Sequence, residues 1–308
     1  MRIGIDLGGT KTEAIVLDND GQECARLRVD SPQGSYAATI EQIKILVNAV
    51  ASKTGCAESV PVGIGIPGAV SPKTGLVKNA NSTWLIGHAL DRDLAAALDR
   101  PVRVANDANC FAVSEAVDGA AKGYGMVFGV ILGTGVGGGI AINGQTHTGI
   151  NAIGGEWGHN PLPWPNLSDR SADTTSEYPG PACYCGKHGC IETFLSGPGL
   201  SRDYETACGQ KAKASEIATR AAKGDANAQA AIQRYMDRLA RSLAGVINIL
   251  DPDIIVFGGG LSHLDGIYEA LPRTLGAYVF SDVCDTPCVK NKHGDSSGVR
   301  GAAWLWPK

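Results

Sequence analysis

The sequence lacks several features that would indicate a membrane or nucleic-acid partner. No apolar run among the 308 residues approaches the length that a bilayer-spanning helix needs. There is no run of lysine or arginine, and a net charge of -4 gives no general attraction to nucleic acid or anionic lipid. The first residues, MRIGIDLGG, are typical of a strand and a glycine turn rather than of a signal or transit sequence. We therefore expect a cytoplasmic protein with no membrane or nucleic-acid partner.

The nine cysteines also lack the spacing of a disulfide framework. Six of them are scattered along the chain, whereas Cys183, Cys185 and Cys190 lie close together. This distribution indicates a reducing environment, in which most of the scattered thiols are small core residues.

The three clustered cysteines predict a zinc site, because a tight glycine-containing turn can direct several sulfurs at one point. A four-coordinate site needs one more ligand, which His159 or His188 could supply. Local spacing favours His188. However, His159 follows Glu156 by three residues and Glu192 follows the last cysteine, so a metal on His159 would bring both carboxylates together. Such a group suits a polyhydroxylated ligand, although a purely structural zinc knuckle explains the pattern equally well.

The predicted strands and helices alternate, which defines an α/β protein. A chain of this length, with 44% hydrophobic and 19% charged residues, can form two globular domains. We expect strands at residues 2–7, 13–17, 61–67, 102–105 and 254–257, and helices at 37–52, 91–98, 107–119, 225–250 and 299–306. Residues 163–181 are rich in proline and polar side chains, and we expect them to form a loop inserted ahead of the cysteines.

An internal repeat relates two predicted hairpins. Residues 4–22, GIDLGGTKTEAIVLDNDGQ, and residues 129–145, GVILGTGVGGGIAINGQ, follow the same plan of strand, glycine-rich tip and strand. A repeat of this kind predicts a duplicated fold with two similar domains on either side of a cleft.

Glycine-rich tips allow backbone N–H groups to approach phosphate closely, because no Cβ intervenes. Two tips could bracket the phosphates of one nucleotide, with Asp6 holding Mg²⁺ through water and Thr10 or Lys11 reaching phosphate oxygens. An ordinary tight turn is the simpler explanation of either tip alone. Residues 133–138 match GxGxxG, but a strand is expected to follow instead of the helix that a dinucleotide fingerprint requires. A Walker P-loop is absent.

Asn106 and Asp107 lie where a predicted strand runs into a predicted helix. Side chains at this point of an α/β fold face the ligand cleft. Asp107 could simply cap the helix. It could also accept the proton of a substrate hydroxyl during phosphoryl transfer, with Asn106 bonding the neighbouring hydroxyl. The two roles are compatible.

Together these motifs resemble the ROK family of repressors and sugar kinases, within the sugar kinase, Hsp70 and actin superfamily, over essentially the whole chain. The resemblance lies in DLGGTKTE (residues 6–13), LGTGVGGG (132–139), EWGH (156–159), CYCGKHGCIE (183–192) and DPDIIVFGGG (251–260). It implies a two-domain actin-like ATPase fold with a zinc-binding module at residues 154–192. The expected small domain comprises residues 1–120 and the C-terminal helix 298–308, and the large domain comprises residues 121–297.

The same resemblance implies a role for each matched residue. Asp107 is the expected general base. The expected sugar contacts are Gly68, Asn81, Asn106, Asp107, Glu156, His159 and Glu192. The expected nucleotide-binding residues are Asp6, Gly8, Gly9, Thr10, Lys11, Gly133, Thr134, Gly135, Gly137, Gly259 and Gly260. The implied zinc ligands are His159, Cys183, Cys185 and Cys190, which leaves His188 out, and the implied cofactors are ATP, Mg²⁺ and Zn²⁺. A homodimer is the common state of such relatives.

Within the family, NANSTWLIG, GGEWGHNPLPW and HGDSSGVRGAAWLWP look most like bacterial manno(fructo)kinases. The expected reaction is therefore transfer of phosphate from ATP to O6 of D-fructose or D-mannose. The alternative is an N-acetylglucosamine kinase, which shares the zinc module. A sugar-sensing repressor of the same family is a rival, but the first strand leaves no room for an N-terminal helix-turn-helix. A partner-moving ATPase would leave Glu156, Glu192 and the cysteines unexplained.

Overall fold

The computed structural model describes residues 1–166, 176–264 and 266–307. Its contacts group the chain into two compact units. The first unit comprises residues 1–129, 139–155 and 291–308, and the second comprises residues 130–138 and 156–290. These limits differ from the expected ones, since residues 121–129, 139–155 and 291–297 group with the first unit. The division of the chain into functional domains at residue 120 stays a prediction.

The first unit contains a five-stranded sheet in the order β3-β2-β1-β4-β7. Its strands are β1 (Arg2–Leu7), β2 (Lys11–Leu17), β3 (Glu23–Asp30), β4 (Val62–Ile66) and β7 (Val102–Asn106). The first three form an antiparallel meander, and β4 and β7 continue the sheet in parallel with β1. The central strands β1 and β4 are almost entirely buried, as their runs of apolar residues predict.

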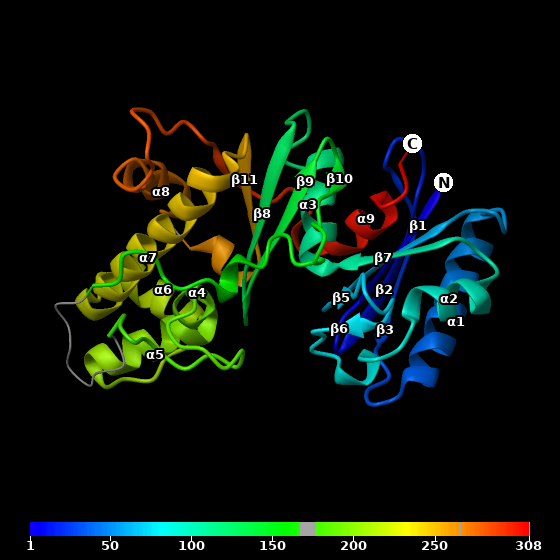
Figure 1. Cartoon of the computed structure of the whole chain (residues 1–308), viewed down its shortest axis with the longest axis horizontal. Coiled ribbons are helices and arrows are strands. Elements are labelled where there is room, and N and C mark those ends of the chain that lie inside the picture. The colour runs from blue at the N-terminus through cyan, green and yellow to red at the C-terminus, as the bar shows by residue number, and fades with distance from the viewer. Residues whose placement is uncertain (167–175, 265, 308) are drawn as a thin grey trace. The chain divides into compact units, whose positions relative to one another are not determined.

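Helices cover both faces of this sheet (Figure 1). Helices α1 (Tyr36–Thr54) and α2 (Leu90–Leu98) pack on one face, and α9 (Ser297–Trp304) packs on the other, between the sheet and α3 (Asp107–Val117). Glycine permits the close approach of α9, because a Cβ at Gly63 would collide with the carbonyl of Ala302. Short elements complete the unit: β5 (Ala69–Val70), β6 (Val77–Lys78), and the 3-10 turns η1 (Thr83–Leu85) and η4 (Gly294–Ser296).

The second sheet repeats the plan of the first. It has the order β10-β9-β8-β11-β12 and is built from β8 (Met126–Leu132), β9 (Val136–Ile142), β10 (Gln145–Thr146), β11 (Ile254–Gly258) and β12 (Cys288–Lys290). Each strand takes the place of its counterpart in β3-β2-β1-β4-β7, with a glycine-tipped hairpin leading the sheet in both cases. The predicted internal repeat and α/β fold are thus confirmed, whereas the cleft between the halves stays a prediction.

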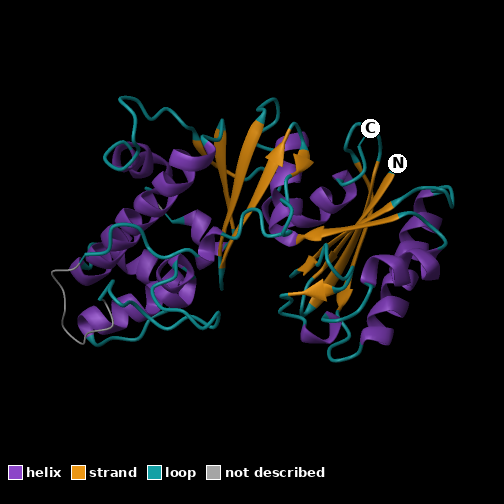
Figure 2. Ribbon diagram, in the orientation of Figure 1, coloured by secondary structure: helices purple, strands orange, loops and turns teal. Residues whose placement is uncertain are grey.

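Outside the strands that it contains, the second unit consists mostly of helices (Figure 2). They are α4 (Ile191–Leu195), α5 (Gly197–Cys208), α6 (Ala214–Ala222), α7 (Ala226–Leu250) and α8 (Ile267–Leu275), together with the 3-10 turns η2 (Trp157–His159) and η3 (Gly260–His263). The long helix α7 packs against α4, α5, α6 and α8, and its buried face includes Tyr235, Leu239 and Leu243. None of the helices in the described part of the chain combines the length and apolar composition that a bilayer-spanning helix requires.

The described ends of the predicted inserted loop, residues 163–166 and 176–181, contain no helix or strand, and residues 167–175 lie outside the described residues. Both ends are held by α7. The guanidinium of Arg241 donates to the carbonyls of Pro163 and Trp164, at 2.9 and 2.8 Å, and to both carboxylate oxygens of Glu177. Arg238 also donates to Glu177, at 2.8 Å. The loop that separates His159 from Cys183 is therefore closed at its base by arginines of α7.

Candidate functional site

Asp6 is the penultimate residue of β1 and lies in a partly buried position on the first sheet. Gly298 makes room for its side chain, because a Cβ there would lie 3.2 Å from a carboxylate oxygen of Asp6. Burial, together with the negative charges of Asp107 and Glu13, raises the pKa of Asp6 to about 7. A divalent cation near Asp6 would relieve the repulsion between these carboxylates, so the donor set fits a magnesium ion.

The first glycine tip, residues 8–11, follows Asp6 and joins β1 to β2. Gly8 donates to the carbonyl of Lys11 at 3.0 Å, and Gly9, Thr10 and Lys11 are exposed. Gly8 has to be glycine here, since a Cβ would lie 2.8 Å from that same carbonyl oxygen. The predicted nucleotide-binding tip is thus a tight, exposed hairpin turn.

Asn106 and Asp107 lie at the junction between β7 and α3, as the sequence predicts. The side chain of Asn106 caps α3 by accepting from the N–H of Ala108 at 2.9 Å, and it also donates to the carbonyl of Gly68 at 3.2 Å. Asp107 is the first residue of α3, and its carboxylate accepts from the same N–H at 2.8 Å. The capping position therefore belongs to Asn106 and not to Asp107. A helix N-terminus favours the ionised form of a carboxylate such as that of Asp107.

Gly68 contacts both Asn106 and Ala80, the residue before the predicted sugar contact Asn81. With a φ of 146°, Gly68 has a backbone conformation that side chains rarely adopt, and a Cβ would lie 2.9 Å from Ala80. Asn81 is the exposed residue that follows Ala80. The first unit thus brings Gly68, Asn106 and Asp107 together and places Asn81 next to them along the chain.

The predicted zinc ligands converge in the second unit. One ligand atom from each of His159, Cys183, Cys185 and Cys190 lies within 4.8 Å of all the others. The sulfurs of Cys185 and Cys190 are 3.6 Å apart, and the Cys183 sulfur lies 3.7 Å from Nδ1 of His159. Ligands bound at about 2.3 Å in a tetrahedron are separated by roughly 3.8 Å, so the spacing fits a zinc ion.

Two further observations bear on this cluster. Without a cation, burial and the neighbouring sulfurs of Cys185 and Cys183 raise the pKa of Cys190 to about 12, so the thiolate form needs a nearby positive charge. Nε2 of His159 lies 2.9 Å from the hydroxyl of Tyr184, a contact that orients the ring. His188, which local spacing favours, is exposed and is not part of the cluster within the described residues. The geometry therefore groups His159, and not His188, with the three cysteines among the described residues, and the zinc site stays a prediction.

The segment that carries Glu156 and His159 packs on the second glycine tip. The indole of Trp157 donates to the carbonyl of Gly137 at 2.9 Å, and Gly158 lies so close to the carbonyl of Val136 that a side chain would collide with it. Glu156 is exposed at the start of this turn. These contacts bring one predicted sugar-binding carboxylate and a predicted zinc ligand to β9.

Glu192, which lies after the cysteines in the chain, contacts the start of β9 next to the second glycine tip. Its Oε2 accepts from the N–H of Val136 at 2.9 Å. A Cβ at Gly135 would lie 2.7 Å from that oxygen, so the glycine is required for this contact. The second unit therefore joins the zinc cluster, Glu192 and the second tip into one hydrogen-bonded group.

A cavity of about 830 Å³ lies within the second unit. It is lined by Gly133 and Thr134 of the second tip, Gly260 and Leu261 at the start of η3, and residues of α5 and α6. The remaining predicted glycine, Gly259, packs against the end of β8, where a side chain would collide with the carbonyl of Leu132. The structure thus brings two predicted nucleotide motifs to one cavity. Lys213 and Thr219 also line it, and no sequence motif marks them.

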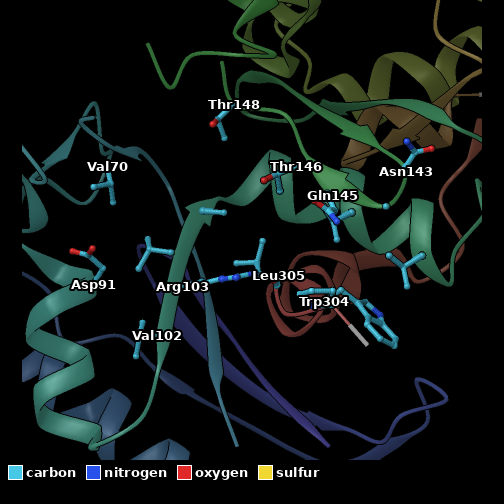
Figure 3. A pocket seen from close by; sticks show the side chains of 16 residues that line it. Val70, Asp91, Val102, Arg103, Asn143, Gln145, Thr146, Thr148, Trp304 and Leu305 are labelled. Carbon is cyan, nitrogen blue, oxygen red and sulfur yellow. Dashed lines mark hydrogen bonds between the residues drawn. The ribbon is translucent and has the colours of Figure 1, made fainter. Parts of the chain in front are cut away.

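A second cavity, of about 730 Å³, lies within the first unit (Figure 3). Asp91, Arg103 and Thr146 are among the side chains around it, and Arg103 donates to the carbonyl of Leu305 at 2.6 Å. None of the predicted site residues lines this cavity. The larger of the two cavities described is therefore the one that the predicted nucleotide motifs line.

Comparison with known proteins shows the class to which this fold and these motifs belong. The model of the ROK family matches residues 2–308, so the chain belongs to the ROK family. It is also similar in structure to the ROK hexokinase from Thermus thermophilus, with a TM-score of 0.84, 28% identity, and coverage of 99% of this chain and 97% of the other. The predicted family and fold are confirmed.

Two other relatives carry more specific names. The N-acetyl-D-glucosamine kinase of Shigella boydii serotype 4 (strain Sb227) is 42% identical over 306 residues, which is 99% of each chain. A ROK family glucokinase from Streptomyces griseus, solved with glucose and AMPPNP, has a TM-score of 0.74, 26% identity and coverage of 99% of this chain and 98% of the other. The prediction of a fructokinase is wrong, because it depended on short segments, whereas 42% identity to an N-acetyl-D-glucosamine kinase extends over the whole chain.

Proposed function

We propose that the protein is an ATP-dependent sugar kinase that phosphorylates N-acetyl-D-glucosamine at O6. The main support is the full-length identity of 42% to an N-acetyl-D-glucosamine kinase. The glucokinase from Streptomyces griseus, whose structure contains glucose and AMPPNP, supports the broader assignment to sugar and nucleotide substrates.

In this proposal Asp107 is the general base. It accepts the proton of the 6-hydroxyl as that oxygen attacks the γ-phosphorus and the bond to the leaving ADP breaks. The position of Asp107 at the start of α3 supports the role, because a helix N-terminus interacts favourably with a negative charge. The hydrogen bond from Asn106 to the carbonyl of Gly68 orients the amide that would bind a neighbouring hydroxyl.

The two glycine tips and the cavity of the second unit bind ATP in this proposal. Gly8, Gly9, Thr10 and Lys11 contact phosphate from the first tip, and Gly133, Thr134, Gly135 and Gly137 do so from the second. Asp6 would hold Mg²⁺, which would supply positive charge to neutralise the phosphates. The cavity lined by Gly260 and α6 is large enough for an adenosine group, which supports its assignment to the nucleotide.

The zinc module shapes the sugar pocket in this proposal. Zn²⁺ bound by His159 and the three cysteines would hold the segments that carry Glu156 and Glu192. Glu156, His159 and Glu192 then contact sugar hydroxyls, together with Gly68 and Asn81. Support comes from the convergence of the four ligand atoms and from the bond between Glu192 and Val136. The homodimer stays a prediction.

A hexose panel tests the proposed substrate. The purified protein, ATP and Mg²⁺ would be assayed with N-acetyl-D-glucosamine, N-acetyl-D-mannosamine, glucose, mannose and fructose, with NMR of the product to locate the phosphate. We expect the highest kcat/KM for N-acetyl-D-glucosamine and a 6-phosphate. A higher kcat/KM for any other sugar would overturn the assignment of the substrate.

A conservative substitution tests the base. We expect Asp107→Asn to reduce kcat by about 100-fold or more, which is the range for general base catalysis, while the sugar still binds. Asp99→Asn is a matched control, because it makes the same chemical change at an exposed residue at the end of α2. The measurements are kcat and sugar affinity by calorimetry. Near-normal turnover by Asp107→Asn would exclude Asp107 as the base.

A further inference from the structure

The carbonyl groups of Gly8, Gly9 and Thr10 in the first glycine tip all accept hydrogen bonds from the segment that follows β3. The hydroxyl of Ser31 donates to the carbonyl of Gly8 at 2.8 Å, and the N–H of Ser31 donates to that of Thr10 at 2.9 Å. The side chain of Gln33 makes a longer contact, 3.5 Å, with the carbonyl of Gly9. Ser31 is therefore the main anchor of the tip.

A buried hydrogen-bond relay fixes the Ser31 hydroxyl. The hydroxyl oxygens of Thr12 and Ser31 are 2.8 Å apart, and both side chains are buried. A hydroxyl carries a single proton, and that of Ser31 is used in the bond to Gly8, so Thr12 must be the donor to Ser31. The relay runs from Thr12 through Ser31 to the carbonyl of Gly8.

This anchoring determines where the N–H groups of the tip point. In a trans peptide the carbonyl of one residue and the N–H of the next point in opposite directions. Since the carbonyl of Gly8 points toward Ser31, the N–H of Gly9 points away from it. In the same way, the carbonyl of Gly9 points toward Gln33, so the N–H of Thr10 points away from Gln33. Among the residues that the structure describes, these two N–H groups have no hydrogen-bond partner, and both residues are exposed.

We propose that Ser31 is a positioning residue for the nucleotide. It holds the Gly8–Gly9 peptide so that the N–H of Gly9 is presented to a phosphate group. Without the hydroxyl, the carbonyl of Gly8 would lose its partner and the peptide could rotate, which would turn the donor away from the phosphate. This inference rests on the proposed function, in which the tip contacts ATP.

The test compares three single substitutions. Ser31→Ala removes the hydroxyl, and Ser31→Thr retains it. Ser114→Ala is the matched control, because Ser114 is also a buried serine of the first unit but its hydroxyl has no hydrogen-bond partner within the described residues. For each protein we would measure the Kd of ADP by calorimetry, the KM of ATP and of the sugar, and the thermal midpoint.

We expect Ser31→Ala to raise the Kd of ADP and the KM of ATP about three- to tenfold, as the loss of one net hydrogen bond implies. The KM of the sugar should stay within about twofold, and Ser31→Thr and Ser114→Ala should bind ADP like the parent. Unchanged ADP binding by Ser31→Ala, or an equal loss of sugar affinity, would overturn the proposal.

A second variant applies if Ser31→Ala does not fold. Thr12→Val removes the donor to Ser31 but leaves the bond from Ser31 to Gly8, so we expect a smaller rise in the Kd of ADP, up to about threefold. No rise would overturn the proposal. A failure of the proposed function can be told apart from a failure of this inference. If the parent protein phosphorylates no hexose, the proposed function is wrong, and the ADP calorimetry still decides the role of Ser31.

Discussion

The contact between Glu192 and the second glycine tip leads to a sharp prediction for Gly135→Ala. The added methyl group would lie 2.7 Å from Oε2 of Glu192, whereas a carbon and an oxygen in contact are normally separated by about 3.3 Å or more. Gly135 does not have the positive φ that would exclude alanine. The carboxylate at the end of a flexible side chain is therefore the group that moves, by about half an ångström.

Such a movement would break the bond between Glu192 and the N–H of Val136. That bond is 2.9 Å long, and lengthening it by half an ångström exceeds the usual limit for an N–H···O bond. A hydrogen bond to a charged group contributes about 1.5–3 kcal/mol. If Glu192 binds the sugar, we expect the KM of the sugar to rise by roughly 10- to 100-fold. The proposal also has Gly135 contact phosphate, so the KM of ATP is measured beside that of the sugar.

Steady-state kinetics and a thermal melt would test this prediction. Gly276→Ala is a suitable control, because a methyl group there meets no atom within 4 Å and the backbone is right-handed. In a Glu192→Ala background, Gly135→Ala should have no further effect on the KM of the sugar, since the two changes act on one contact. A folded Gly135→Ala protein with an unchanged KM for the sugar would refute the reasoning.

Two further predictions concern the zinc cluster and the inserted loop. We expect Cys185→Ser to lose both its bound zinc and its affinity for the sugar. Metal analysis and sugar calorimetry would measure the two losses, with Cys24→Ser as control. Normal sugar binding without zinc would show that the metal is only a structural element remote from the sugar. For the loop, burial alone would raise the pKa of Glu177, but bonds from Arg241 and Arg238 outweigh it and hold the pKa at about 2, below its usual 4.5. A carboxyl with a depressed folded pKa stabilises the fold above its unfolded value, so about 3 kcal/mol should be lost as the pH falls from 4.5 toward 2. Chemical denaturation across this range should show a shallower loss for Glu177→Gln. This variant should also be less stable than the parent at pH 7, because it removes one carboxylate partner from Arg238 and Arg241, which keep Asp203 and Asp237. Equal slopes for the two proteins would contradict the prediction.

Much of the fold could be predicted because its signals are local. The apolar runs of β1 and β4, the periodic helices α1 and α7, and the glycine tips each depend on residues that are close together in the chain. Helices such as α5 were not predicted. It begins Gly-Pro-Gly, which is typical of a turn, and its helical state depends on packing against α4, α6 and α7.

The sequence by itself predicted the family, the repeated hairpins and the cluster of three cysteines, because each of these signals lies in residues that are close together in the chain. Tertiary structure decided the choice between His159 and His188, since it depends on folding a distant segment back onto the cysteines. It also decided that Glu192 bonds to Val136, 56 residues away, and that Ser31 holds the first tip. Such contacts join residues that are far apart in the chain, and only the packed fold brings their atoms within hydrogen-bonding distance.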